Sequence, residues 1–278
     1  MAGRLYVVAT PIGNMGDLSP RAAEVLASVD VVAAEDTRVT GKLLARVDAK
    51  NRMVSYREQT EHRLSEELVA RMLEGESVAL VSDAGTPTIS DPGYRLVHAA
   101  AEAGVEVVSV PGPSAVIALL SVSGLPTDHF RFEGFAPHKS AARRQLLESL
   151  RGAGTTAVFY ESPHRVVEFL RDVADVLGDP PVAAGRELTK LHEEVVRGAA
   201  SEVAGRFSGH EPRGEFVVAV HVERVEEELA GDALDREVAA LHAEGLPARE
   251  IAARLKPRGA HRRDVYAALR RLGADSES

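Results

Sequence analysis

Short apolar runs alternate with longer amphipathic stretches in the N-terminal part of the chain. The runs are rich in valine and apolar on both faces, which is typical of strands buried in a parallel sheet. The predicted strands are residues 5–9, 29–34, 53–56, 78–82 and 105–110. Helical periodicity lies between them, at residues 20–27, 64–73 and 94–103. This alternation predicts an α/β fold with a parallel sheet.

Proline and glycine mark the expected ends of several helices. The pairs Ser19-Pro20, Asp91-Pro92 and Ser162-Pro163 each place a capping side chain before a proline that suits the first helical turn. Gly104 follows the third predicted helix, where a C-terminal cap belongs, and residue 178 ends the helix that Ser162-Pro163 begins.

A second α/β unit is predicted from residue 114 to residue 223. Its candidate strands are residues 130–135, 156–160, 182–187, 194–197 and 216–221. The last strands are short and close together in sequence, which favours a mixed sheet over an all-parallel one. The uncharged stretch 107–127 has the length of a membrane span, but Pro111, Gly112, Pro113 and Gly124 interrupt it. It fits strand, turn and buried helix better, and no membrane partner is expected.

The C-terminal part differs from the rest in charge. Residues 223–232 are predicted to form an acidic linker, and two short amphipathic helices follow at 249–255 and 263–272, in the outline of a helix-turn-helix. Residues 246–272 hold eight basic and two acidic side chains, although the whole chain carries a net charge of −9. The predicted domains are therefore 1–113, 114–223 and a basic helical extension at 233–278.

The composition excludes several kinds of site. The 278 residues include no cysteine, so disulfides, thiolate zinc sites and a cysteine nucleophile are excluded. The histidines show no close pair at metal-ligand spacing, so no metal is expected. The N-terminus leads straight into a predicted strand without the apolar core of a signal peptide, which predicts a cytoplasmic protein.

Three turns rich in glycine, proline and serine each follow a predicted strand. They are TPIGN at 10–14, SDAGTP at 82–87 and PGPSA at 111–115. Parallel sheets bind ligands beyond the carboxyl ends of their strands. Because these turns carry few charges, they predict a neutral or zwitterionic small molecule held largely by main chain. The Rossmann and Walker phosphate-binding signatures are absent.

Two of these turns are compatible with more than one role. Asp83 could accept a hydrogen bond from a ribose hydroxyl, or could simply form the turn or cap a helix. Residues 112–114 could begin a helix whose exposed amides bind an anion.

Together with EDTR at 35–38, FYESPHR at 159–165 and RELTK at 186–190, the three turns resemble the tetrapyrrole-methylase superfamily. They are most similar to its branch of ribosomal RNA cytidine-2′-O-methyltransferases, over about residues 4–222. The resemblance implies two α/β domains with an S-adenosylmethionine cleft between them and a homodimer. It also implies 2′-O-methylation of a decoding-centre cytidine in the 16S RNA of the small ribosomal subunit. The cofactor contacts that it implies are Pro11, Asp83, Ala84, Gly85, Thr86, Ser114 and Tyr160.

Ribose methylation needs a group that takes the hydroxyl proton. The candidates are Glu35, Asp36, Glu58, Glu161, Glu187 and Lys190. Glu187 and Lys190 are three residues apart and would share a face of a helical turn, so they are the preferred pair, with Asp36 as a further catalytic candidate. The alternative for Glu187 and Lys190 is a structural ion pair between the domains.

Basic residues suggest where RNA would bind. Arg38 and Arg186 are expected to steer phosphates, and Lys139, Arg143 and Arg144 would form a backbone-binding track with Arg262 and Arg263 of the extension. Such a run is more often a solvated helix face. Two rival functions remain: a methylase of a small tetrapyrrole-like metabolite, and a non-enzymatic RNA-binding factor. A small substrate would need neither basic region.

Overall fold

The computed structural model describes residues 2–209, 213–224, 229, 231–256 and 259–273. The chain forms two compact units. The first holds residues 1–149 and 155–222, and the second holds residues 150–154 and 223–278. Apart from residues 150–154 and 223, the two predicted α/β domains lie in the first unit, and they are called the N-terminal half and the second half below. The predicted boundary between them remains a prediction.

The N-terminal half contains a parallel sheet of five strands in the order β3-β2-β4-β1-β5. Its strands are β1 (Arg4–Val8), β2 (Val31–Ala34), β3 (Arg52–Ser55), β4 (Val78–Val81) and β5 (Glu106–Val110). Every residue of β2 and β4 is buried, as expected for central strands covered on both faces. The parallel sheet predicted from the sequence is confirmed.

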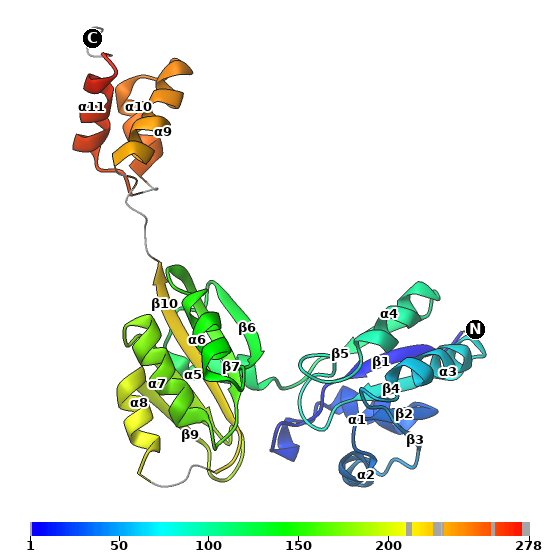
Figure 1. Cartoon of the computed structure of the whole chain (residues 1–278). Helices are drawn as coiled ribbons and strands as arrows, with labels where there is room; N and C mark the ends of the chain where they lie inside the picture. The colour runs from blue at the N-terminus through cyan, green and yellow to red at the C-terminus, as the bar shows by residue number, and fades with distance from the viewer. Residues whose placement is uncertain (1, 210–212, 225–228, 230, 257–258, 274–278) are drawn as a thin grey trace. The chain divides into compact units, whose positions relative to one another are not determined.

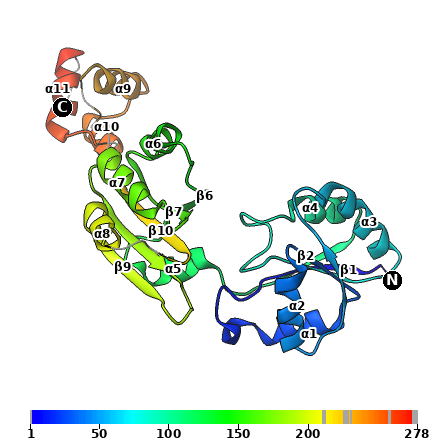
Figure 2. The ribbon, with the colours of Figure 1, turned by 60° about the horizontal axis from the view of Figure 1, so that its bottom comes forward.

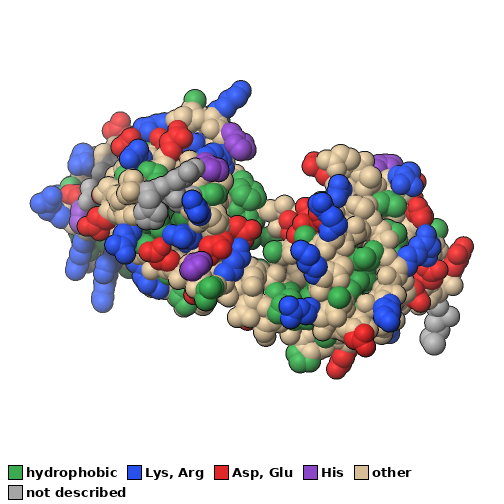
Figure 3. All heavy atoms as spheres, turned by 90° about the horizontal axis from the view of Figure 1, so that it is seen from below, with side chains coloured by type: hydrophobic (Ala, Val, Ile, Leu, Met, Phe, Trp, Pro, Cys, Tyr) green, Lys and Arg blue, Asp and Glu red, His purple; other side chains and the backbone are tan. Residues whose placement is uncertain are grey.

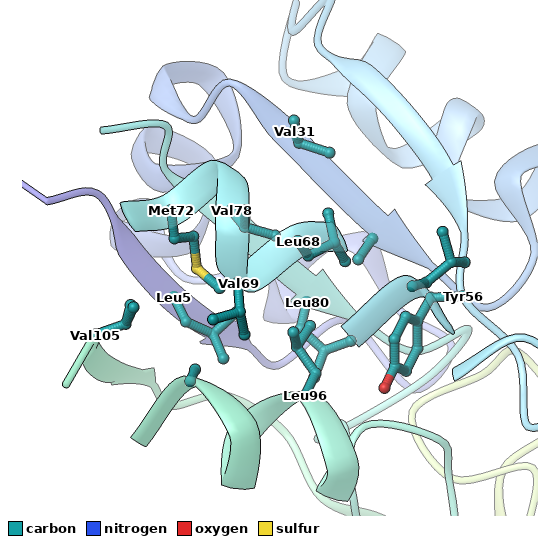
Figure 4. Close-up of a cluster of buried hydrophobic side chains, with 13 residues drawn as sticks. Leu5, Val31, Tyr56, Leu68, Val69, Met72, Val78, Leu80, Leu96 and Val105 are labelled. Atoms are coloured by element: carbon teal, nitrogen blue, oxygen red, sulfur yellow. The ribbon is translucent and has the colours of Figure 1, made fainter. Parts of the chain in front are cut away.

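Helices cover both faces of this sheet. They are α1 (Pro20–Ser28), α2 (Thr37–Arg46), α3 (Glu61–Leu73) and α4 (Tyr94–Glu102), with a short 3₁₀ helix η1 (Met15–Asp17). Figures 1 and 2 show α3 and α4 on one face of the sheet and α1 and α2 on the other. Leu68 of α3 and Leu96 of α4 pack on Leu5 and Leu80 of the strands (Figure 4), whereas Leu26 of α1 belongs to the opposite cluster.

Helix α2 is absent from the sequence prediction. Its sequence, TRVTGKLLAR, contains two threonines, a valine and a glycine, all of which have low helix propensity. The helix forms because Asp36 caps it, accepting a hydrogen bond from Arg38 N at 2.8 Å, and because Leu43 and Leu44 pack in the core.

The second half contains a mixed sheet in the order β6-β7-β10-β8-β9, as predicted. The pair β6–β7 is parallel, whereas β10–β8 and β8–β9 are antiparallel. The strands are β6 (Phe130–Phe135), β7 (Ala153–Glu161), β8 (Pro181–Arg186), β9 (Glu194–Ala199) and β10 (Phe216–Arg224). The helices are α5 (Ala115–Ser123), α6 (Ser140–Glu148), α7 (Val166–Leu177) and α8 (Ala200–Phe207).

Alternating strand residues pack this half together. Val158 of β7 lies in a cluster with Leu119 of α5. The next residue, Phe159, contacts Phe169 of α7 with ring centroids 5.0 Å apart. Because successive strand residues point to opposite faces, α5 and α7 cover opposite faces of the sheet.

The second unit contains a small helical core. It consists of α9 (Gly231–Ala243), α10 (Ala248–Leu255) and α11 (Arg262–Arg271), which share buried leucine, valine and alanine side chains. Figure 1 shows the three helices packed together. The prediction of two helices is confirmed and α9 is an addition. Half of the predicted acidic linker, and part of the turn between α10 and α11, lie outside the described residues.

Two predicted helix caps are wrong. Helix α4 begins at Tyr94, as predicted, but its N-cap is Gly93, and α7 begins only at Val166, with Arg165 as its N-cap. The pairs Asp91-Pro92 and Ser162-Pro163 lie in the preceding turns. Ser19 does cap α1, with Ala22 N donating to Ser19 Oγ at 3.0 Å, and Gly178 ends α7 in the left-handed conformation.

Among the described residues, no helix is long and apolar enough to cross a bilayer, and no group of three or more histidine, aspartate or glutamate residues could hold a metal ion.

Candidate active site

A pocket of about 430 Å³ lies at the carboxyl ends of the parallel strands in the first unit. Loops that follow β1, β2, β4 and β5 supply one wall, and residues at the end of β7 and the start of β10 supply the other. This volume is within the range of small-molecule sites, and the position agrees with the rule for open α/β sheets.

Backbone hydrogen bonds join the loops after β1 and β4. Thr10 N donates to Gly85 O at 2.8 Å, Gly85 N donates to Thr10 O at 3.1 Å, and Thr10 Oγ1 donates to Ser82 O at 3.2 Å. Gly85 has a φ of +79°, which a residue with a side chain adopts only under strain. These contacts fix two of the three predicted ligand-binding turns against each other.

Most of the predicted cofactor residues line this pocket. Asp83, Ala84, Gly85, Thr86, Ser114 and Tyr160 are all on its surface. Pro11 is not: it lines a second, adjacent pocket, and the next residue, Ile12, takes its place on the wall of the first. The prediction also missed the segment 214–217, because no motif distinguishes that turn in the sequence.

An aromatic cluster forms part of the pocket wall in the second half. The ring of Tyr160 lies 4.9 Å from that of Phe132 and 5.5 Å from that of Phe135, in edge arrangements. Burial raises the pKa of the Tyr160 phenol, so its hydroxyl is neutral at physiological pH. Phe135 is 59% exposed, which leaves a large apolar surface open at the pocket.

The opposite wall carries three carboxyl groups, those of Glu35, Asp83 and Asp91. Asp83 links the loop after β4 to the loop after β2, because its Oδ1 accepts a hydrogen bond from Asp36 N at 3.0 Å. Burial raises the pKa of Glu35, and the charge of Asp83 adds to this effect. Burial, assisted by the charge of Glu35, raises the pKa of Asp91 to about 6.

Asp91 was missed as a site residue because the following proline made it look like a helix cap. In the structure Asp91 lines the pocket, and α4 has Gly93 as its N-cap without a side-chain cap. The preceding loop has two non-glycine residues with positive φ, Thr88 at 76° and Ser90 at 65°. Backbone strain of this kind tends to gather at functional sites.

Glu187 and Lys190 form an ion pair, as their spacing suggested. Lys190 Nζ donates to Glu187 Oε1 at 2.8 Å and to Glu215 Oε2 at 2.9 Å, while Glu215 N donates to the same Glu187 oxygen at 3.0 Å. The Lys190 side chain also lies so close to Gly13, in the loop after β1, that a Cβ there would collide with it. The pair thus connects the β8–β9 turn to both walls of the pocket.

These contacts change the expected chemistry of the pair. The hydrogen bond from Lys190 lowers the pKa of Glu187. Burial alone would lower the pKa of Lys190, but its bonds to Glu187 and Glu215 raise it. Each partner holds the other in its charged form, so neither is well suited to take a proton near neutral pH.

Asp36 and Glu161 are engaged in local contacts. Asp36 caps α2 and pairs with the Arg38 guanidinium, which holds the pKa of Asp36 well below its usual range. Glu161 is 2% exposed, and its Oε1 accepts from Ser162 N at 2.7 Å and lies 2.5 Å from Arg165 Nη2. These contacts favour structural roles at the ends of β2 and β7.

The predicted RNA-binding arginines of α6 are bound to α7. Arg143 is 1% exposed, and its Nη2 lies 2.7 Å from Glu168 and 2.6 Å from Asp172. Arg144 lies 2.6 Å from Asp172 and 3.4 Å from Asp175. A buried guanidinium cannot contact a phosphate on the surface, so the prediction that Arg143 binds RNA does not fit this structure.

The other predicted RNA-binding residues are more accessible. Arg38 and Lys139 are exposed, whereas Arg186 is half-buried and lies 3.5 Å from Glu194. In the second unit Arg262 lies over the ring of Tyr266, and Arg263 Nε lies 3.3 Å from Asp264. Figure 3 shows lysine and arginine side chains on the same face as aspartate and glutamate side chains.

Two curated proteins with similar sequences have the same name. The chain is 45% identical over 270 residues to "Ribosomal RNA small subunit methyltransferase I" of Xylella fastidiosa, covering 95% of this chain and 98% of that relative. It is 49% identical over 235 residues to the protein of that name from Vibrio cholerae, covering 83% and 82%.

Solved structures show the same fold. Diphthine synthase matches with a TM-score of 0.62 at 15% identity, covering 79% of this chain and 90% of that one. Uroporphyrin-III C-methyltransferase from Thermus thermophilus, complexed with S-adenyl homocysteine, matches with a TM-score of 0.52 at 19% identity, covering 78% and 97%.

The model of the family "Tetrapyrrole (Corrin/Porphyrin) Methylases" matches residues 4–204. This range includes the whole parallel sheet, strands β6 to β9 of the mixed sheet and the pocket residues from Ile12 to Leu188. With this match and relatives at such identity over most of its length, the chain belongs to the tetrapyrrole methylase family.

Proposed function

We propose that this protein transfers a methyl group from S-adenosylmethionine to the RNA of the small ribosomal subunit, at the 2′-hydroxyl of a cytidine in 16S RNA. The observation that carries the proposal is the pocket, in which an acidic wall faces an aromatic one at the ends of the parallel strands. The names of the relatives support RNA of the small subunit as the substrate class.

The residues of the pocket fit a cationic methyl donor. When bound, S-adenosylmethionine supplies an electrophilic methyl group on a positively charged sulfur. The carboxyl groups of Glu35, Asp83 and Asp91 complement such a charge, and the backbone of residues 84–86 offers uncharged hydrogen-bonding groups. A metal is therefore not needed to explain the charge balance of the pocket. Holding the reacting groups in line can supply up to about 7–11 kcal/mol of the barrier.

We infer that Asp91 accepts the proton of the ribose hydroxyl. It lines the pocket, and a pKa of about 6 keeps its carboxyl group ionised at neutral pH yet more basic than an ordinary aspartate. Of the candidates from the sequence, Glu187 and Asp36 have lowered pKa values, which makes them weaker bases. As the oxygen gains the methyl group, its proton passes to the Asp91 carboxylate.

Glu187 and Lys190 then act as a positioning pair. A Cβ on Gly214 would lie 2.5 Å from the Glu187 side chain, and Gly214 and Glu215 both line the pocket. By bonding to Glu215 on one side and packing on Gly13 on the other, the pair sets the distance between the two walls.

Labelled methyl transfer tests the proposal. Small ribosomal subunits that lack the modification are incubated with the protein and S-adenosylmethionine carrying a labelled methyl group, and the RNA is digested to nucleosides. Label in 2′-O-methylcytidine is expected. Transfer to a tetrapyrrole precursor and none to RNA would support the metabolite methylase instead. Cofactor binding without transfer to either substrate would support a non-enzymatic RNA-binding factor.

The Asp91→Asn variant tests the proton acceptor. The wild-type rate should rise with pH through about 6 as Asp91 loses its proton. The variant should be slower by about 10²- to 10⁴-fold and should lose this pH dependence. The circular dichroism spectrum and the urea unfolding curve of the variant are the controls for folding. An unchanged pH profile in the variant would exclude Asp91 as the acceptor.

We also propose a homodimer and a cytoplasmic location. Ile117 and Val122 of α5 are 53% and 46% exposed, and these apolar side chains support an interface between two copies of the chain at that helix. The molar mass in solution, measured by light scattering, should be twice that of the 29.7 kDa chain. Ile117→Lys should lower it to that of a monomer.

A further inference from the structure

Helix α2 carries three cations in one row. Arg38, Lys42 and Arg46 are four residues apart and exposed, and α2 contains no acidic residue. Residues at this spacing lie on one side of a helix, about 6 Å apart along its axis. The buried side of α2, with Leu43 and Leu44, faces the core. The row therefore lies on the solvent side of α2.

Two of these cations have no protein partner among the residues that the structure describes. Arg38 pairs with Asp36 at 2.5 Å. Within the described ranges, Lys42 and Arg46 have neither an ion pair nor a side-chain hydrogen bond. On the adjacent loops, Asp36 binds Arg38, and Asp83 Oδ1 accepts from Asp36 N. Lys42 and Arg46 are thus available to an anion from outside the chain.

A second pocket, of about 280 Å³, lies beside this row. Lys42 and Arg46 form part of its wall, and Pro11, Met15, Val39 and Leu43 make much of the rest apolar. Met15 and Val39 are 41% and 42% exposed, so the apolar surface is accessible. Asp83 lines both pockets, so the second one lies next to the candidate active site.

We propose that α2 and this second pocket bind the RNA strand next to the target nucleotide. Lys42 and Arg46 contact successive phosphates, and the apolar wall receives the sugar or base of one flanking nucleotide. This proposal rests on the proposed function, because it assumes that the target ribose enters the first pocket. Cations beside an apolar hollow suit a single-stranded nucleic acid, which presents phosphates and flat apolar faces together.

The test compares two double variants that remove the same charge. Lys42→Gln/Arg46→Gln changes the row on α2. Arg21→Gln/Arg52→Gln is the matched control, since both residues are exposed, belong to the same half and lie outside both pockets. The affinity for purified small ribosomal subunits is measured over a range of salt concentrations, and S-adenosylmethionine binding is measured by calorimetry.

The α2 variant should bind subunits roughly tenfold more weakly, and its log–log salt slope should be smaller by about 1 to 2, because two phosphate contacts are lost. Cofactor binding should not change, and the control should stay within about twofold of the wild type. A third variant, Val39→Glu, places a negative charge in the pocket without removing a cation and should also weaken subunit binding.

Equal affinity and equal salt slopes for the α2 variant and the control would overturn the proposal, even if methyl transfer to RNA is observed. Failure of the wild-type protein to methylate RNA would contradict the proposed function instead. The binding comparison does not depend on turnover, so the two failures are distinguishable.

Discussion

Helices α2 and α6 have similar basic sequences but use their cations differently. On α6, Arg143 and Arg144 are bound by Glu168, Asp172 and Asp175 of α7. On α2, Lys42 and Arg46 have no such partners among the described residues and line a pocket. The basic run of α6 therefore serves packing within the second half, whereas the row on α2 remains available for binding.

The difference shows that a count of charges does not identify an RNA-binding surface. What matters is whether a carboxylate lies close enough to pair with each cation. On α6 both arginines have such a partner, because Asp172 of α7 accepts hydrogen bonds from Arg143 and Arg144. A charge that is neutralised inside the protein contributes little to counterion release on RNA binding.

The largest expected effect concerns the stability contributed by Arg143. Arg143→Ala leaves Glu168 and the buried Asp172 short of a partner, so the free energy of unfolding should fall by about 3–5 kcal/mol. Urea denaturation measures the change. Arg144→Ala, which removes a guanidinium that is 42% exposed, should cost no more than about 1 kcal/mol. Equal losses in the two variants would contradict the distinction between a buried and a surface pair.

For RNA affinity, substitutions on α2 should have a larger effect than substitutions on α6. Arg144→Gln should change the affinity for small ribosomal subunits by less than about twofold, because its charge is already neutralised by Asp172 and Asp175. Filter binding at two salt concentrations measures this effect beside the α2 double variant. If Arg144→Gln weakened binding as much as Lys42→Gln/Arg46→Gln, the conclusion that α6 lies outside the RNA interface would be wrong.

The smallest expected effect concerns the cap of α2. Because Arg38 lowers the pKa of Asp36, the ionised carboxylate stabilises the folded state above the ordinary pKa of aspartate, and this contribution is lost as the pH falls. In Arg38→Gln the pKa of Asp36 should rise toward its ordinary value, and stability should depend less on pH in the acid range. Titration of the carboxyl carbon by NMR measures the shift. An unchanged pKa would show that the hydrogen bond from Arg38 N is sufficient.

Much of the fold could be predicted from the sequence, because buried strands and amphipathic helices have clear periodicity. The strand 130–135 was predicted at its observed bounds, and the other strands within a few residues. Helix α2 could not be predicted in this way, since its tertiary packing overrides the weak propensity of Thr37, Val39 and Gly41.

The parts of the site that lie in sequence motifs could be predicted. The roles that depend on which distant residues contact a side chain could not. The loops after β1, β4 and β5 meet as their positions at strand ends indicated. Asp91 resembles a helix cap in the sequence, and only the fold places it in the pocket. The partners of Arg143 lie 25 and 29 residues away, too far for local spacing to reveal them.

Cross-linking to RNA tests most directly whether α2 contacts RNA and α6 does not. The protein is bound to small ribosomal subunits, irradiated with ultraviolet light and digested, and the peptides attached to RNA are identified by mass spectrometry. We expect cross-linked peptides from Thr37–Arg46 and from the loop that contains Met15, and none from Ser140–Glu148. Cross-links at Ser140–Glu148 without any at Thr37–Arg46 would contradict the account.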